Sequence, residues 1–99
     1  MIIIRQNLHQ LFELGTVVAT PGAISLLDEL DIDATELISR HQAGDWGDVD
    51  EHDREVNFQS VEYGMRIMSV YRVGVGREVV WIITEADRSV TTLLLPEEY

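Results

Sequence analysis

The chain contains no cysteine and no lysine, and only two of its 99 residues are proline. Without cysteine it can form no disulfide, no thiolate metal site and no thiol nucleophile, a composition that fits a reducing cytosol. Long apolar runs are also missing at the N-terminus, because Ile2–Ile4 is followed at once by Arg5. Such a run is too short for a signal sequence or a membrane span. We therefore expect a soluble, cytoplasmic protein that does not associate with membranes.

Length and composition are those of one small globular domain. Hydrophobic residues make up 45% of the chain and charged residues 25%, a balance that allows a core and disfavours disorder. A chain of this length has room for one such core. No internal repeat, low-complexity stretch or linker divides the sequence. We therefore predict a single domain that spans residues 1–99.

Positive charge is scarce, and negative charge is concentrated in one part of the sequence. Eighteen acidic residues face seven arginines, for a formal net charge of −11. Eleven of the acids lie from Asp28 to Glu55, where only Arg40 and Arg54 oppose them, so this acidic segment carries 2 − 11 = −9. Direct binding to DNA, RNA or an anionic membrane needs clustered cations. The charge therefore disfavours those ligands and favours a basic protein partner.

The first third of the chain predicts two helices with a short strand between them. Leu8, Leu11 and Phe12 share one face of a helix over Gln6–Leu14, and Gly15 ends it. Residues 16–19 are β-branched and apolar, as in a short strand. Thr20 then serves as an N-cap and Pro21 as the first helical residue. The apolar stripe of this second helix consists of Ala23, Leu26, Leu27 and Leu30.

Two further helices are predicted in the acidic segment. Asp33 and Glu36 have the spacing of a capping box at the start of the third helix, and Gly44 is placed to end it. The run 48–51 opens a fourth helix with acidic residues, which the helix dipole favours, and Gly64 closes that helix.

After residue 64 the hydrophobic period changes from helical to alternating. Residues 65–73, 79–84 and 90–95 predict three strands, joined by a glycine-rich loop at 74–77 and a polar turn at 85–88. Short loops between consecutive strands indicate an antiparallel meander, which needs helices on one face to be stable. The predicted fold is therefore α+β, with N-terminal helices packed on a C-terminal three-stranded antiparallel meander.

Several stretches together resemble a known family. They are residues 14–23, Gly44-Asp45-Trp46-Gly47-Asp48, residues 81–92 and the C-terminal run 95–99. Read together, they resemble a family of short bacterial proteins that are common on plasmids and other mobile elements, sometimes labelled as type I restriction subunits. The resemblance covers nearly the whole chain after about Asn7. It implies a bacterial accessory protein and supplies no catalytic mechanism. The restriction label carries little weight, because the chain has neither a glycine-rich cofactor loop nor an Asn-Pro-Pro-Tyr motif.

Four aspartates crowd the turn before the fourth predicted helix: Asp45, Asp48, Asp50 and Asp53. A hard metal ion binds several converging carboxylates, but the spacing here does not match the calcium-binding EF-hand loop. Helix capping and solvated charge explain the same residues. We therefore expect no metal and no cofactor at this turn.

The three histidines are the natural candidates for acid–base chemistry. His41 lies on an apolar helix face, so we expect it to be packed in the core, whereas His52 has acidic neighbours and is the first histidine to test if an activity is found. No serine has an evident base and orienting group beside it. The competing hypothesis is nonetheless a small toxin-like ribonuclease. Its candidate residues are His52, Arg66, Tyr71 and Arg88.

Two loops admit both a structural and a functional interpretation. Trp46 lies between glycines and aspartates, and its indole either fills the core or anchors a partner. Filling the core is the commoner use of tryptophan in so small a domain, so we expect the indole inside. The hairpin tip 84–89 carries both charge signs, and turn formation and recognition explain it equally well.

The leading hypothesis is an accessory protein without enzymatic activity that presents an acidic surface to a basic protein partner. Its sharper form is a DNA mimic or inhibitor, which would occupy the nucleic-acid groove of a restriction or regulatory protein. The residues expected to contact the partner are Asp45, Asp48, Asp50, Asp53, Glu85, Asp87 and Arg88. No residue is assigned a catalytic role, and the sequence leaves the oligomeric state open.

Overall fold

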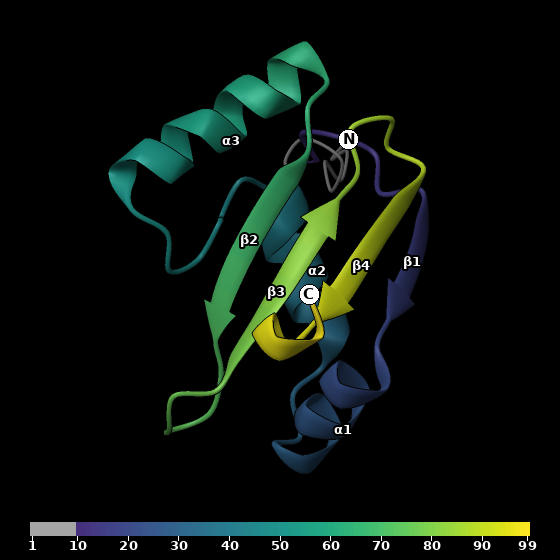
Figure 1. The fold of residues 1–99 in the computed structure, drawn as a ribbon, viewed down its shortest axis with the longest axis vertical. Helices are drawn as coiled ribbons and strands as arrows, with labels where there is room; N and C mark the ends of the chain where they lie inside the picture. The colour runs from purple at the N-terminus through teal and green to yellow at the C-terminus, as the bar shows by residue number, and fades with distance from the viewer. Residues whose placement is uncertain (1–9) are drawn as a thin grey trace, which may run out of the picture.

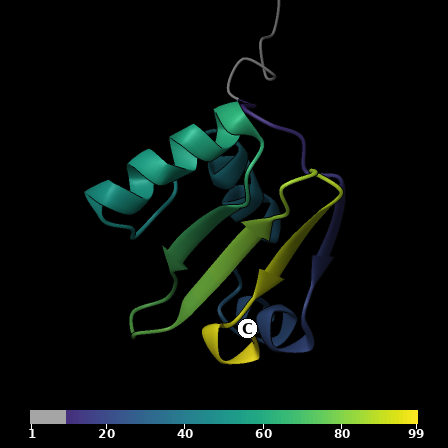
Figure 2. The same cartoon turned by 45° about the horizontal axis from the view of Figure 1, so that its top comes forward.

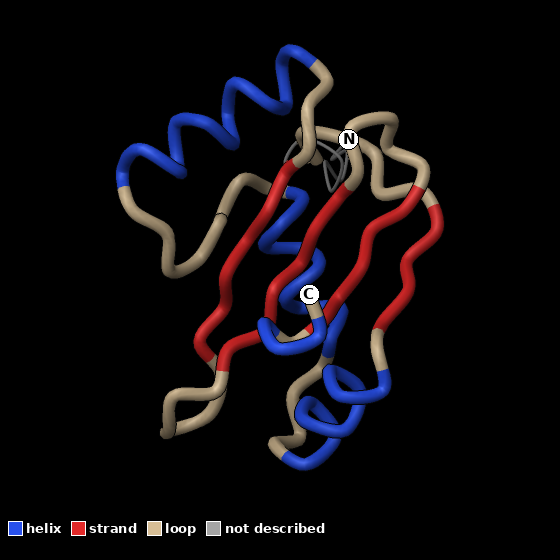
Figure 3. Tube along the Cα trace, viewed as in Figure 1, coloured by secondary structure: helices blue, strands red, loops and turns tan. Residues whose placement is uncertain are grey.

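The computed structural model describes residues 10–99, which form one four-stranded sheet and three α-helices (Figures 1 and 3). The elements in chain order are β1 (Thr16–Ala19), α1 (Pro21–Glu29), α2 (Ala34–Gln42), α3 (Glu51–Tyr63), β2 (Ile67–Arg72), β3 (Val79–Thr84), β4 (Val90–Leu94) and the 3₁₀ turn η2 (Pro96–Glu98).

The sheet has the strand order β1-β4-β3-β2 and is mixed. β2, β3 and β4 pair antiparallel in sequence, as the meander prediction requires, but β1 joins the sheet parallel to β4, with Val17 opposite Thr91. The predicted three-stranded antiparallel sheet with N-terminal helices is therefore wrong. The helices lie in mid-chain, between β1 and β2. The four residues of β1 are too few to show the alternating period of a strand. Its pairing with β4 also could not be predicted, because β4 lies more than seventy positions away in sequence.

The helix predicted over Gln6–Leu14 is also wrong where it can be compared. Residues 10–14 are not helical, and residues 6–9 lie outside the described part of the chain. The Leu11 amide donates to the Gln42 carbonyl at 2.8 Å, and the Gln42 side chain donates to the Phe12 carbonyl at 2.8 Å. This segment thus bonds to the end of α2, and the Leu11 amide and Phe12 carbonyl are paired without helical bonds.

The helix boundaries follow the predicted capping residues. Side chains of Thr20, Asp33 and Asp50 accept amide hydrogen bonds at the N-termini of α1, α2 and α3. The predicted capping box is absent, because Asp33 accepts the amide and hydroxyl of Thr35 instead of the Glu36 amide. Gly64 ends α3 with φ = 70°, in the left-handed region that glycine adopts without steric cost.

α1 and α2 cover one face of the sheet. On the face turned toward the viewer in Figure 1 there is no α-helix of the described residues, but the turn η2 lies in front of β3 and Tyr99 packs on Trp81. We call these the helix-covered face and the open face; Figure 2 shows the same arrangement from a second direction. The main core lies on the helix-covered face and consists of Ala23, Leu27, Leu37, Tyr71, Val73, Val80, Ile82 and Leu93. A second cluster, formed by Phe12, Trp46 and Ile67, includes Val61 of α3 at its margin.

The β2 edge of the sheet is closed by groups from outside the sheet. The Asn57 side chain of α3 donates to the Met68 carbonyl at 2.8 Å and accepts from the Met68 amide at 3.2 Å. Two residues further on, the Val70 amide donates to Trp46 and the Val70 carbonyl accepts from Asp48. An edge strand whose outward groups are paired in this way cannot join a strand of another molecule.

We expect Asn57→Ala to lower the free energy of unfolding by about 1–3 kcal/mol, because it leaves two partly buried backbone groups of Met68 unpaired. Urea denaturation followed by circular dichroism measures the change. Gln59→Ala, on the exposed side of the same helix, is the matched control and should have almost no effect. Equal stability of the two variants would contradict the role given to Asn57.

Candidate functional site

The loop between α2 and α3 is organised around a buried tryptophan. The Trp46 side chain is only 3% exposed, so the prediction that it lies inside is confirmed. Its indole stacks on Phe12 with ring centroids 6.2 Å apart and meets His41 and Phe58 edge-on at 6.0 and 5.4 Å. Gly44 precedes the loop with φ = 89°, a conformation that a residue with a Cβ atom adopts only under strain. These aromatic contacts fix the indole in the core.

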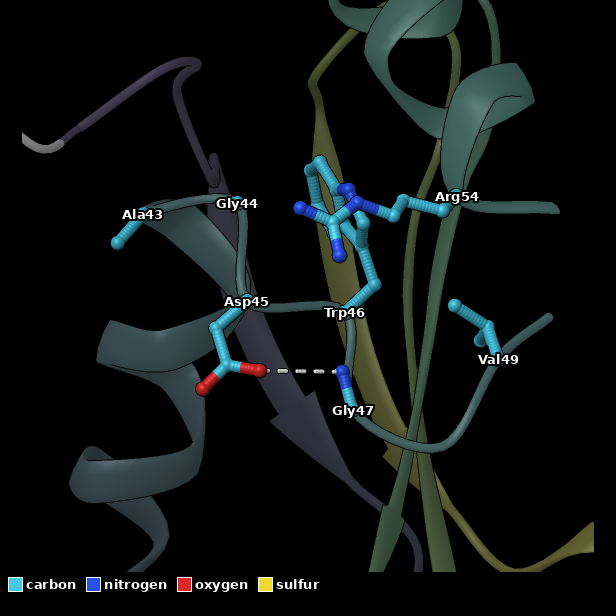
Figure 4. Close-up of a pocket in the computed structure, with 7 residues that line it drawn as sticks. All are labelled: Ala43, Gly44, Asp45, Trp46, Gly47, Val49 and Arg54. Atoms are coloured by element: carbon cyan, nitrogen blue, oxygen red, sulfur yellow. Dashed lines mark hydrogen bonds between the residues drawn. The ribbon is translucent and has the colours of Figure 1, made fainter. Parts of the chain in front are cut away.

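A hollow of about 330 Å³ lies beside this tryptophan. It is lined by Ala43, Gly44, Asp45, Trp46, Gly47, Val49 and Arg54. In Figure 4 the Arg54 side chain extends from α3 in the direction of the indole, while the Asp45 carboxylate accepts the Gly47 amide. The Trp46 Nε1 atom is buried and has no hydrogen-bond partner among the described residues. The hollow thus combines one carboxylate, one guanidinium and the edge of an apolar core.

Asp45 holds this loop against α2. Its carboxylate accepts two bonds from the Arg40 guanidinium, at 2.7 and 3.4 Å, and a third from Gly47 at 3.2 Å. The Arg40 hydrogen bond holds the pKa of Asp45 below its usual value. The Asp45 carbonyl accepts the buried Tyr71 hydroxyl at 2.6 Å. Asp45 therefore has a structural role, and half of its side chain still faces solvent.

The other three aspartates near α3 do not converge. Asp48 pairs with Arg72 of β2 at 2.7 Å. Asp50 accepts the Asp53 amide at 2.8 Å and so caps α3. Within residues 10–99 no group of three or more histidine or acidic side chains is placed to hold a metal ion. In the same range no helix is both long and apolar enough to cross a membrane.

The hairpin tip between β3 and β4 is held by its own charged residues. Glu85 accepts two hydrogen bonds from Arg66 at 3.2 Å each. Asp87 accepts hydrogen bonds from Ser89, which lower the pKa of the Asp87 carboxyl. These contacts give both acids a role in the turn, and their recognition role remains a prediction.

Arg88 joins the hairpin tip to the end of α3. Its guanidinium donates to the Ser60 carbonyl at 2.8 Å and the Met65 carbonyl at 2.7 Å. It also donates to the carbonyls of Glu85 and Ala86, at 3.1 and 3.2 Å. Four backbone acceptors use most of the donors of one guanidinium. Arg88 thus holds together two segments that are far apart in sequence, a role that no local pattern in the sequence indicates.

A chain of buried hydrogen bonds crosses the sheet beneath α2. His41 Nδ1 lies 2.6 Å from Ser69 Oγ, and His41 Nε2 lies 2.9 Å from Thr84 Oγ1. Thr84 Oγ1 is 2.7 Å from Thr91 Oγ1, which donates to the Leu14 carbonyl at 2.7 Å. The four side chains are fully buried, which confirms the packed position predicted for His41. The sequence signal for the other three was a polar residue at a core-facing position of an apolar strand.

The direction of every bond in this chain follows from its last acceptor. A carbonyl oxygen only accepts, so the Thr91 hydroxyl donates its single proton to the Leu14 carbonyl. The Thr91 oxygen must therefore accept from the Thr84 hydroxyl. Thr84 must then accept from His41 Nε2, which therefore carries the ring proton. The ring is neutral because burial lowers the pKa of His41 to about 3, so Nδ1 accepts from Ser69. With every proton committed and no exposed member, the chain ties strands together and offers nothing to a substrate.

The four residues of the ribonuclease hypothesis are not assembled into a site. Tyr71 is buried, its hydroxyl is donated to Asp45, and burial raises its pKa. Arg66 and Arg88 both contact Glu85, which follows β3. Arg88 also bonds to Ser60, near the C-terminal end of α3. His52 lies in the first turn of that helix, roughly 16 Å away along its axis at 1.5 Å per residue.

Comparison of the chain with protein-family models, with curated proteins and with solved structures finds no match. By its fold, the protein is a small α+β domain with a mixed four-stranded sheet. The resemblance to the mobile-element family remains a prediction.

We expect Trp46→Ala to lower the free energy of unfolding by about 3–5 kcal/mol, because it leaves a cavity between Phe12, His41 and Phe58. Trp46→Phe should cost clearly less, since a phenyl ring keeps most of the aromatic contacts and removes the unpaired Nε1 donor. Urea denaturation followed by circular dichroism compares the two. A fully stable Trp46→Ala variant would show that the indole does not support the core.

The buried histidine predicts a specific pH dependence of stability. The unfolded chain binds a proton at His41 below pH 6.5, whereas the folded protein does so only near pH 3. The free energy of unfolding should therefore decrease as the pH is lowered from 7 to 5, and this one group should contribute about 2 kcal/mol to the decrease. His41→Gln lacks this titration, so its stability should fall less over the same range. Parallel stability curves for the two proteins would contradict the assignment.

Proposed function

We propose that this protein is a non-enzymatic interaction module that binds a basic protein partner through the acidic segment, Asp28–Glu55. One observation carries the proposal: all eleven acidic residues of this segment are exposed. Among the described residues only Asp45 and Asp48 of the eleven form a salt bridge with arginine. The other nine carboxylates lie on the surfaces of α1, α2, α3 and their connections and have no arginine partner within residues 10–99.

Exposed charges of one sign attract a partner of the opposite sign before contact and speed its association. The segment builds consecutive helices of a domain whose own core keeps their backbones fixed, so a partner meets its charges already in place. A preorganised surface avoids part of the entropy that a flexible acidic tail loses on binding. The hollow beside Trp46 lies within this segment and gives the surface a concave point for a partner side chain.

Binding has more support than catalysis because three of the four candidate catalytic side chains, Arg66, Tyr71 and Arg88, are held in structural hydrogen bonds. The buried histidine commits both ring nitrogens to hydroxyl groups, and Arg88 commits its guanidinium to four carbonyls. A ribonuclease also needs a positive groove for its substrate, and the chain has seven arginines in all. In the sharper form of the proposal, a DNA mimic, the carboxylates take the place of phosphates in a partner's nucleic-acid groove.

The test uses immobilised protein, a host lysate and stepwise salt elution, with mass spectrometry of the eluted proteins. The expected partner is basic and leaves the column as salt screens the exposed charges within about 8–10 Å. The variant Asp28→Asn/Glu36→Gln/Glu55→Gln removes one charge from each helix and keeps all capping residues. It should slow association with the purified partner by roughly tenfold and change dissociation little.

The matched control is Glu13→Gln/Glu62→Gln/Glu97→Gln, which removes three exposed charges outside the acidic segment. It should leave association close to that of the wild type. Equal slowing by both variants would show that only net charge matters. Addition of duplex DNA tests the sharper form: a partner of a DNA mimic binds DNA and this protein in competition, whereas simultaneous binding rules mimicry out.

A further inference from the structure

The hollow beside Trp46 is lined by a residue whose hydrogen bonding is incomplete. The indole Nε1 atom of Trp46 is buried and has no hydrogen-bond partner within residues 10–99. Most buried N–H groups in folded proteins are paired, because an unpaired one loses its bond to water and gains nothing in return. The side chains packed around the indole supply no acceptor: Phe12 and Phe58 carry none, and both ring nitrogens of His41 are already bonded. In this part of the chain, the hollow remains as the route by which an acceptor reaches Nε1.

Arg54 brings a second set of donors to the same hollow. Its side chain extends from α3 toward the indole, and both residues line the hollow (Figure 4). Arg54 forms no salt bridge within residues 10–99, whereas Arg40, the other arginine of the acidic segment, is paired with Asp45. An exposed side chain without a fixed partner changes rotamer rapidly, so it can move to admit a ligand and then bond to it.

Asp45 gives the hollow an acceptor as well. Its carboxylate accepts three hydrogen bonds, two from Arg40 and one from the Gly47 amide, and 54% of the side chain is still exposed. A carboxylate has about four lone-pair sites, so one remains for a ligand. The lining therefore offers two donors, the indole and the guanidinium, together with one acceptor and the apolar side chain of Val49.

This mixed lining selects a neutral group that both donates and accepts. A carboxylate would accept from Arg54 and Nε1, but it would be repelled by Asp45 and the other acids of the segment. An ammonium or guanidinium group would donate to Asp45, but it has no acceptor for Nε1 and would be repelled by Arg54. A primary carboxamide carries an oxygen with two lone pairs and an NH₂ group with two donors, so it can bond to all three side chains.

We infer that the hollow binds the side-chain carboxamide of an asparagine or glutamine residue of the partner protein. The carboxamide oxygen accepts from Trp46 Nε1 and the Arg54 guanidinium, and the NH₂ group donates to the Asp45 carboxylate. The volume of about 330 Å³ is far larger than the roughly 30 Å³ of one water molecule in the liquid, so a side chain can enter.

The inference deepens the proposed function and rests on it for the identity of the ligand as part of a basic protein. Attraction between exposed charges brings basic proteins to the acidic segment but distinguishes little among them. A site built around buried polar groups rejects a ligand that leaves those groups unpaired. The hollow therefore selects, among basic proteins, one that presents a carboxamide within its basic surface.

Nuclear magnetic resonance with propionamide, which models the glutamine side chain, tests the site without the partner. The protein has two indole N–H groups, and a Trp81→Phe variant assigns their resonances. Propionamide should move the Trp46 indole proton downfield in a saturable way and leave that of Trp81 in place. Propionate and propionamidinium have the same shape but carry a negative and a positive charge. They should bind more weakly by roughly tenfold or more, because each leaves a group of the hollow unpaired.

Two variants test the donors. Arg54→Gln should weaken propionamide binding by roughly tenfold, because it removes a charged donor. Arg77→Gln is the matched control, since Arg77 is exposed, lies outside the hollow and forms no salt bridge within residues 10–99. Trp46→Phe, followed through the Gly47 amide resonance, should weaken binding to a similar extent as Arg54→Gln. Circular dichroism verifies that each variant is folded.

The inference is overturned if the Trp46 indole proton does not respond to propionamide, or responds equally to all three probes. Equal binding of N-methylacetamide also overturns it, because that result identifies a peptide group as the ligand. A nuclear Overhauser effect from bound water to the Trp46 indole proton that propionamide leaves unchanged would show that the hollow holds water only.

The partner captured from the lysate provides the last measurement. Its affinity should fall in saturating propionamide, and an unchanged affinity overturns the inference by placing the hollow outside the interface. Salt-dependent capture through the exposed acids does not require the hollow. Failure of this inference and failure of the proposed function are therefore distinguishable.

Discussion

The hydrogen-bond chain from Ser69 through His41, Thr84 and Thr91 to the Leu14 carbonyl is the contact on which the arrangement of this fold depends. It joins α2 to β2, β3 and β4, and it reaches the segment just before β1. Apolar packing alone would allow these elements to slide, because it has no direction. A chain in which each donor has one possible acceptor admits one register, since any shift would leave buried polar groups unpaired.

The two edges of the sheet differ in whether their outward backbone groups are hydrogen-bonded. At β2, Asn57 and the 46–48 loop occupy the outward backbone groups, so the helix α3 and the Trp46 loop are both held by the strand that they protect. At the other edge, the β1 strand has no partner on its outer side among the described residues. The same loop therefore links three features: the closure of the β2 edge, the second core cluster and the hollow within the acidic segment.

The helices and the sheet contribute chemically different parts of the surface. The helices and their connections carry the carboxylates that have no arginine partner among the described residues, whereas the open face of the sheet carries apolar side chains that η2 and Tyr99 partly cover. The carboxylates therefore lie on the helices, and apolar residues of the other face of the sheet, such as Ile83 and Leu94, are already buried within the domain.

The sequence by itself determined the local features of this protein. Capping residues such as Thr20 and Asp50, the glycine at 64 and the hairpin loops act on neighbours a few positions away, so their effects can be read from the chain. The burial of His41 also followed from its place on an apolar helix face, whereas that of Trp46 was expected only because tryptophan usually fills the core of so small a domain. Tertiary structure alone decided the place of β1, the roles of Asn57 and Arg88, and the commitment of the predicted contact residues Asp45 and Glu85 to arginine partners. Each of these depends on groups brought together from distant positions, and a local period or composition carries no information about which distant group will be present.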